Sequence, residues 1–325
     1  MHSPQRRLVR RMLPMVAWGT ITLVAGLHSS RTLAQPSLSF WDHWGDGQAE
    51  VSAYDLTVPR YGELRRGTAV AVVVTEPFSD SERVKADPGR HPAADEHQVL
   101  KLNLMFDFQT GVYDYHTMTS TFVLLGNRGS RAAGTATKVS FSSQEWCGQV
   151  WHQLRFDEDN VREQIHSYFD GEADLSRTFP RQTKGISEDA LWLWARGLAA
   201  PFLPENGATV RVPFLPSLFS SRLQHRVLDW QDVTLVASTT LETVSVPAGD
   251  FSVWRRTATS ADGVRRTFLV ERAAPHRVIS YEDSLGGRAV LRGVERMKYW
   301  ERNRRGDERL LEHLGLRGPA PGLSP

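Results

Sequence analysis

The stretch His97–Leu125, HQVLKLNLMFDFQTGVYDYHTMTSTFVLL, decides the fold. In its first half, apolar residues occupy every second position from Leu100 to Phe108, and polar residues such as Lys101 and Asp107 lie between them. An alternation of period two is typical of a β-strand with one buried face and does not fit a helix. The glycine-containing turn at 109–111 then leads into a second run of β-branched and aromatic residues. The stretch therefore predicts a β-hairpin.

Similar segments extend this β-pattern on both sides of the hairpin. Turn signals separate them at 246–251, 261–263 and 285–287. Short strands spaced by turns predict a mainly β fold, which is either a curved antiparallel sheet or a half-open barrel. The further expected strands are 50–58, 67–78, 137–143, 147–156, 162–173, 239–246, 250–260, 264–271, 276–283 and 288–300.

Two segments have helical rather than β character. In SEDALWLWARGLAAPF, Ser187 is an expected N-cap and two acids follow it, which predicts a covering helix of about three turns over 187–199. Its broad apolar belt favours one of two roles: it plugs the concave face of the sheet, or it lies over a ligand cavity. A second short helix is expected near the C-terminus, after Gly306.

The N-terminal residues 1–34 have the three-part order of a secretory signal peptide. Four arginines precede an uncharged run from Met12 to Leu27, and small residues place the cleavage after Ala34. The alternative is an uncleaved anchor, although the run is shorter than the roughly 20 residues of a spanning helix. The remaining chain predicts one β-rich domain over 35–316, with β-halves at 40–178 and 205–300 joined by the helical segment. A tail at 317–325, rich in proline and glycine, is expected to be disordered.

The charge and the cysteine content of the chain limit its possible cellular locations and its possible binding partners. Removal of the five arginines in 1–34 changes the net charge from +2 to −3, so the mature chain is not a nucleic-acid binder by composition. The chain has one cysteine and therefore no internal disulfide. No cysteine follows the cleavage site, which excludes a lipoprotein. The sequence predicts an exported, periplasmic or envelope-associated protein without a stable transmembrane segment if the signal is cleaved.

The lone cysteine, Cys147, lies in QEWCGQVWHQL. A reactive thiol needs a cation or a base nearby, whereas Glu145 is an acid and would raise the pKa of a thiol. In an extended strand, alternation would place His152 on the opposite face. We therefore expect Cys147 to be a small packed residue of a strand. The alternative is a reactive thiol that is approached by His116 or His166 from another strand.

Acidic residues alternate in YFDGEAD, at Asp170, Glu172 and Asp174. Oxygen ligands at every second position suggest a calcium site, but the EF-hand order fails because Arg181 stands at the twelfth position. A solvated strand end is the simpler interpretation. The chain has no HExxH, no glycine-rich phosphate loop and no GxSxG, so no catalytic residue is assigned and no cofactor is expected.

Tryptophan is abundant in the mature chain. Core packing accounts for most of these residues, but an aromatic cavity would suit a lipid or acyl chain. The candidate ligand-binding residues are Trp146, Trp151, Trp192 and Trp194.

The motifs QEWCG, SYFDGEAD, VPAGDFSVWR and APHRVISYE occur in this order in the chain. Together with RYGELRRGTA and VTEPF, they resemble a family of exported bacterial proteins with a domain of unknown function. The resemblance covers most of 41–300. It implies an antiparallel, strongly curved or barrel-like sheet similar to that of periplasmic lipoprotein carriers, and it implies no catalytic set.

Three functions follow from these observations. The first is non-enzymatic binding of an apolar or lipid-like ligand in the curved sheet of an exported envelope protein. The alternative is a packed scaffolding protein that interacts with an envelope protein partner. The second alternative is a hydrolase that uses Glu145 or the cluster of Asp170, Glu172 and Asp174.

Overall fold

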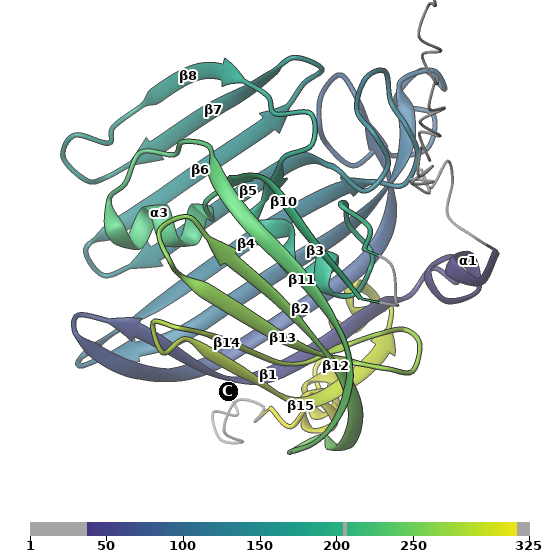
Figure 1. The fold of residues 1–325 in the computed structure, drawn as a ribbon, viewed down its shortest axis with the longest axis vertical. Helices are drawn as coiled ribbons and strands as arrows, with labels where there is room; N and C mark the ends of the chain where they lie inside the picture. The colour runs from purple at the N-terminus through teal and green to yellow at the C-terminus, as the bar shows by residue number, and fades with distance from the viewer. Residues whose placement is uncertain (1–37, 204–206, 317–325) are drawn as a thin grey trace, which may run out of the picture. The chain divides into compact units, whose positions relative to one another are not determined.

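The computed structural model describes residues 38–203 and 207–316 and contains one large open β-sheet (Figure 1). The expected signal peptide at 1–34 and the expected tail at 317–325 lie outside the described residues. The strands are β1 (Ala49–Arg60), β2 (Glu63–Ser79), β3 (Glu96–Thr110), β4 (Tyr113–Leu124), β5 (Ala136–Glu145), β6 (Gly148–Phe156), β7 (Asn160–Ser167), β8 (Leu175–Pro180), β9 (Ile186–Ser187), β10 (Ala208–Leu215), β11 (Gln231–Val246), β12 (Gly249–Ser260), β13 (Arg265–Glu271), β14 (Val278–Asp283) and β15 (Arg288–Met297).

The order across the sheet is β8-β7-β6-β5-β4-β3-β2-β1-β15-β14-β13-β12-β11-β10-β9. Neighbouring strands are antiparallel, apart from the short parallel pair of β9 and β10. The helical elements are α1 (Leu38–Trp44), η1 (Glu188–Ala190), α2 (Leu191–Ala195), α3 (Leu218–Gln224), η2 (Tyr299–Glu301) and η3 (Asp307–Leu314), where η denotes a 3-10 helix. The predicted mainly β fold is confirmed.

The hairpin predicted from 97–125 is formed by β3 and β4. Their register runs from Val99 opposite Leu124 to Thr110 opposite Tyr113 and covers the whole length of β4. Leu100, Leu102 and Phe108 are buried, as the alternation requires. The hydrophobic pattern thus fixes the register, because a shift by one residue would turn this face toward solvent.

The first and the last strand meet in the middle of the sheet. β1 pairs with β2 on one side and with β15 on the other, from Ala49 opposite Met297 to Thr57 opposite Arg288. The register shifts once, between Ala53 and Tyr54. The two expected β-halves are therefore the two sides of a single sheet, joined at the β1–β15 pair.

The sheet bends so that its two sides face each other across a common core. In Figure 1, β10 to β14 lie in front of β3 to β5. One cluster of buried side chains contains Leu102 of β3 and Tyr115 of β4 together with Val233 of β11 and Phe268 of β13. Burial of this shared apolar surface stabilises the bend.

The expected covering helix lies between these two sides. Ser187 is the N-cap, and its hydroxyl accepts a hydrogen bond from the Asp189 amide. The helical segment is shorter than predicted, because α2 ends at Ala195 and Gly197 follows in the left-handed region, with φ of 73°. All five residues of α2 are buried. The Trp192 ring packs edge-on against Tyr54, at 5.3 Å between ring centroids. Most of the surface of α2 is buried against the sheet. This corresponds to the first of the two expected roles, in which the helix plugs the concave face.

A buried ion pair fixes the end of this segment to β1. Arg196 donates to both carboxylate oxygens of Glu50, at 2.7 and 3.2 Å, and their side chains are 5% and 2% exposed. Arg196 also donates to the carbonyl oxygens of Pro275 and His276. Burial alone would raise the pKa of Glu50, but Arg196 and His43 lower it to about 2. One guanidinium thereby links β1, α2 and the loop before β14.

Several elements were not expected or have other bounds. The strand expected over 162–173 ends at Ser167, where the chain turns. The strands β8, β9 and β10 were not predicted, since β9 has only two residues and β10 contains Pro213. The predicted C-terminal helix after Gly306 is confirmed as η3. Among the described residues, no helix is both long and apolar enough to cross a membrane.

Candidate functional site

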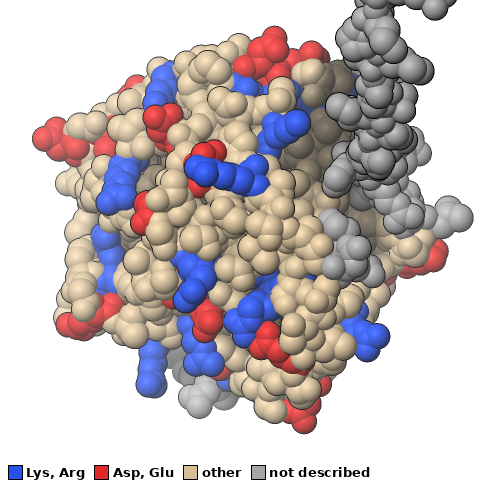
Figure 2. Space-filling view, in the orientation of Figure 1, with Lys and Arg blue, Asp and Glu red and all other residues tan. Residues whose placement is uncertain are grey.

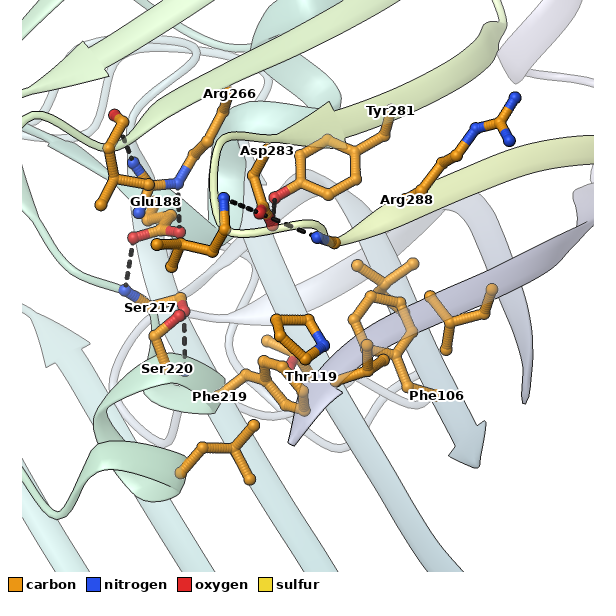
Figure 3. A pocket seen from close by; sticks show the side chains of 18 of the residues that line it. Phe106, Thr119, Glu188, Ser217, Phe219, Ser220, Arg266, Tyr281, Asp283 and Arg288 are labelled. Atoms are coloured by element: carbon orange, nitrogen blue, oxygen red, sulfur yellow. Dashed lines mark hydrogen bonds and ion pairs between the residues drawn. The ribbon is translucent and has the colours of Figure 1, made fainter. Parts of the chain in front are cut away.

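A cavity of about 220 Å³ lies on the concave side of the sheet, where α2 and α3 leave space between the two sides (Figure 3). β1 and β3 form one wall, β13 to β15 form another, and the helical segments form the rest. The apolar lining residues are Leu56, Val58, Leu104, Phe106, Leu191, Trp192, Phe219, Leu223 and Phe268. Their number makes the interior predominantly apolar, as is typical of small-molecule sites.

Polar groups gather at one end of this cavity. Figure 3 shows Glu188, Ser217, Arg266, Tyr281 and Asp283 on the side opposite Phe106. They come from η1, from the N-cap of α3 and from β13 and β14. The site is therefore amphipathic, with an apolar body and a polar end.

Two neighbouring carboxylates organise the polar end. Glu188 accepts from Arg266 Nε at 2.6 Å and from the Ser217 amide at 3.1 Å. Asp189 accepts from the Leu218 amide at 3.2 Å. Both carboxylates thus receive amides from the first residues of α3, where helix N–H groups have no partner within the helix. The acids of the SED motif join one helical segment to the start of another.

Burial shifts the protonation of both carboxylates. It raises the pKa of Glu188, while the nearby Arg266 guanidinium opposes the shift. Burial also raises the pKa of Asp189 to about 7, and the negative charge of Glu188 adds to the effect. Two adjacent acids in a poorly solvated site cannot both ionise at low cost. Asp189 therefore changes its charge near neutral pH.

Tyr281 and Asp283 form the facing part of the polar end. Burial, followed by the charge of Asp283, raises the pKa of Tyr281 well above its usual value, so the hydroxyl remains protonated and donates to Asp283 at 3.0 Å. The other oxygen of Asp283 accepts the amides of Leu285 and Gly287. These contacts hold the turn between β14 and β15 against the cavity.

Two arginines attach α3 to the opposite side of the sheet. Arg222 donates to Glu145 of β5 at 2.8 Å, with both side chains at most 3% exposed. Arg60 of β1 donates to the Leu223 carbonyl at 2.8 Å. The helix presents Phe219 to the cavity, and the Phe219 ring packs edge-on against Phe106 at 5.3 Å. These contacts anchor the C-terminal end of α3, while Glu188 and Asp189 hold its start.

The four candidate tryptophans lie in different environments. Trp192 lines the cavity. Trp194 is buried in the core, and it does not line the cavity. Trp151 stacks on His166, at 5.3 Å between ring centroids, away from the cavity lining. Trp146 is 74% exposed in the turn between β5 and β6. Only the Trp192 assignment therefore coincides with the cavity.

The expectation that Cys147 is packed inside a strand is wrong. Glu145 pairs with Gly148, so Trp146 and Cys147 form the two-residue turn between β5 and β6, and the thiol is exposed. The alternation had been continued across this turn, which misplaced the residue. His152, which alternation had placed on the face opposite Cys147, is buried and contacts Glu163 at 2.8 Å.

We expect Cys147 in the folded protein to react with a maleimide at the rate of a free thiol, because the turn is already open to solvent. Cys147→Ser should change the free energy of unfolding by less than about 0.5 kcal/mol, as for other exposed positions. Mass spectrometry after timed labelling, with and without urea, measures the rate. Labelling that requires urea would contradict the exposed position.

The residues of the acidic cluster lie in a loop, and two of them contact different histidines. Asp170, Glu172 and Asp174 lie in the loop between β7 and β8 rather than in a strand. Glu172 contacts His225 at 2.5 Å, and Asp174 contacts His166 at 2.6 Å. In 38–203 and 207–316, no group of three metal-ligating side chains is close enough to hold an ion.

Sequence reasoning found part of the site and missed part of it. The apolar face of β3 and the SED motif were recognised, and both contribute to the cavity. The helix α3 was missed, although Ser217 before an apolar pair is an N-cap signal. Arg266 and Tyr281 had no local signal, because their neighbours come from η1 and from the turn at 283–287.

The chain was compared with protein-family models, with curated proteins and with solved structures. No family model, no curated protein and no solved structure matches it. The resemblance to exported bacterial proteins stays a prediction, and the functional interpretation depends on the geometry of the cavity.

Proposed function

We propose that this chain is an exported envelope protein that binds an apolar or lipid-like ligand in its concave cavity without catalysing a reaction. The observation that carries the proposal is the amphipathic cavity between the two sides of the sheet. The three-part N-terminal sequence supports export.

The size of the cavity limits the ligand class. At about 220 Å³ it is smaller than the roughly 300–1,000 Å³ of pockets for drug-sized ligands. A single slender chain or a small apolar molecule would fit better than a lipid with several acyl chains. Phe106, Trp192 and Phe219 would contact the apolar part.

The polar end supports an amphipathic ligand rather than a pure hydrocarbon. Ser217 and Ser220 line the cavity beside Glu188 and Asp189. A ligand hydroxyl or a protonated carboxyl would find hydrogen-bond partners there. Arg266 is already paired with Glu188, so the polar end itself offers an ionised head group little positive charge, whereas the Arg288 guanidinium lines another part of the cavity.

The two alternative functions have less support. A packed scaffold would agree with the way α2 fills most of the concave face, but it leaves the cavity without a role. For a hydrolase, Glu145 is held in a buried ion pair with Arg222, and the acidic cluster lies in a loop with histidine partners. No observation favours the hydrolase.

Native mass spectrometry of the protein, purified gently from the envelope fraction, tests the proposal. We expect a fraction of the molecules to retain an apolar ligand mass. Leu104→Trp should fill the cavity and reduce this fraction at least tenfold, because the larger side chain takes the space that the ligand would occupy. Leu241→Trp adds the same volume at an exposed position outside the cavity lining and serves as the matched control.

A clean apo mass for the unaltered protein would support the scaffold instead. Equal retention by Leu104→Trp and by the unaltered protein would place the ligand elsewhere. Circular dichroism and the urea midpoint establish that both tryptophan variants are folded before retention is compared.

A further inference from the structure

A second surface, on the convex side of the sheet, combines exposed aromatic rings, three arginines and an apolar groove. Lys298–Arg305, KYWERNRR, connects β15 to η3, and every residue of it is exposed. We name this stretch the arginine–aromatic segment. Trp300 is 45% exposed and Tyr299 is 38% exposed, and their rings contact each other edge-on at 5.2 Å.

The charges of this segment are mostly positive, and its arginines have no charged partner among the described residues. It contains four basic residues and one acid, Glu301, which pairs with Lys298 at 3.6 Å. The side chains of Arg302, Arg304 and Arg305 form no hydrogen bond or ion pair with any residue in 38–203 or 207–316. The mature chain carries −3 overall, so this positive charge is local. On the face of β10 to β14, by contrast, both signs are interspersed (Figure 2).

An apolar groove of about 530 Å³ adjoins the segment. Its floor is the convex face of β1 to β3, and its side is η3. The apolar lining includes Val51, Val70, Val72, Met105, Leu311 and Leu314. Arg302, Arg304 and Arg305 line its polar edge together with two acids of η3, Asp307 and Glu308, whose carboxylates accept the backbone amides of Arg304 and Gly306. The close approach of η3 to the sheet is fixed at Gly293, where an added Cβ would lie 2.6 Å from the His313 carbonyl oxygen.

We propose that the arginine–aromatic segment and this groove dock the protein on an anionic membrane surface. Arginine recognises phosphate through paired hydrogen bonds. Tryptophan and tyrosine favour the boundary between head groups and acyl chains. The groove offers apolar surface for part of an acyl chain beside the guanidinium groups that would hold its phosphate. The inference does not depend on the ligand of the concave cavity, because the two sites lie on opposite faces of the sheet.

Other partners fit fewer of these features. A nucleic acid would use the arginines but leave the apolar groove unused. An acidic peptide would use both, yet the two exposed aromatic rings next to basic side chains match the composition of membrane-interface segments more closely. The lipid surface therefore accounts for the rings, the arginines and the groove together.

Vesicle co-sedimentation of the purified full chain tests the proposal. Vesicles of phosphatidylcholine with about one-third phosphatidylglycerol should bind it, whereas pure phosphatidylcholine should bind it far more weakly. Each basic side chain near such a surface contributes about a fivefold change in partition, so the triple variant Arg302→Gln/Arg304→Gln/Arg305→Gln should bind roughly 100-fold more weakly. Trp300→Ala should also weaken binding, and 0.5 M salt should screen it.

The matched control removes the same charge elsewhere. Arg90, Arg226 and Arg272 are exposed, and no ion pair of their side chains joins them to other described residues. The triple glutamine variant at these positions should bind like the unaltered protein. An equal loss in this control would overturn the proposal by showing that net charge alone drives binding.

Three further outcomes would overturn it. One is equal binding to both vesicle types. Another is displacement from vesicles by millimolar inorganic phosphate or by RNA, which would identify a different anion as the partner. The third is vesicle binding that appears only after residues 317–325 are deleted, which would show that the chain itself occupies the groove.

Discussion

Glu50→Gln is expected to lower the free energy of unfolding by about 3–5 kcal/mol, the cost of removing one partner from a buried ion pair. The Arg196 guanidinium would stay buried, at 5% exposure, without its counter-charge. The backbone carbonyls of Pro275 and His276 satisfy part of its hydrogen bonding but do not neutralise it. The effect is large because the same guanidinium joins β1, the covering segment and the loop before β14.

Urea unfolding, followed by tryptophan fluorescence, measures the change as a shift of the midpoint at constant slope. Asp232→Asn is the matched control, because the Arg211–Asp232 pair has a similar 2.7 Å distance but is 70% and 47% exposed. Such a surface pair contributes about 0–1 kcal/mol. A double change of Glu50 and Arg196 to methionine should be less destabilising than Glu50→Gln. Equal midpoints for Glu50→Gln and the unaltered protein would contradict the buried pair.

Asp189→Asn is expected to change how stability depends on pH. The pKa of Asp189 is raised from 3.8 in a model peptide to about 7 in the folded protein. The folded state therefore binds the proton more tightly than the unfolded state. The contribution of the Asp189 carboxyl to the free energy of unfolding is fully present below about pH 4 and is lost as the pH rises through 7. Over that window the unaltered protein should lose about 4 kcal/mol of unfolding free energy from this group.

The asparagine variant cannot ionise, so this part of the slope should vanish, and the variant should be the more stable protein at pH 8. Urea midpoints from pH 4 to 8 measure both effects. Asp80→Asn provides a contrast of opposite sign, because Arg131 and Arg83 outweigh burial and lower the pKa of Asp80 to about 2. Asp80→Asn should change how the free energy of unfolding depends on pH below about pH 4, and it should leave this dependence unchanged between pH 4 and 7. An unchanged slope for Asp189→Asn would refute the assignment.

The sequence predicted the local features of the fold well. Alternation in 97–125 gave both strands of the hairpin, since one face of each strand is buried along most of its length. Ser187 and the two acids after it gave the start of the covering segment. Each of these signals depends on residues that are neighbours in the chain.

Features that depend on distant residues were not accessible in this way. The pairing of β1 with β15 joins residues about 240 positions apart. No feature of the sequence Ala49–Arg60 identifies β15 as its partner strand. The cavity arises where η1, α3 and β13 to β15 meet. The turn at Trp146 and Cys147 was missed because neither residue is a usual turn former, and only the pairing of Glu145 with Gly148 across the two strands reveals it.

The placement of β15 beside β1 bears on the order in which the molecule assembles. Until the segment Arg288–Met297 is available, β1 has an unpaired edge in the centre of the sheet. Exposed edges of this kind recruit other chains, and contacts between remote residues form slowly. During synthesis from the N-terminus onward, the polypeptide must therefore be shielded until almost all of it has been made. We expect a product truncated before Arg288 to aggregate rather than to persist as a half-sized protein.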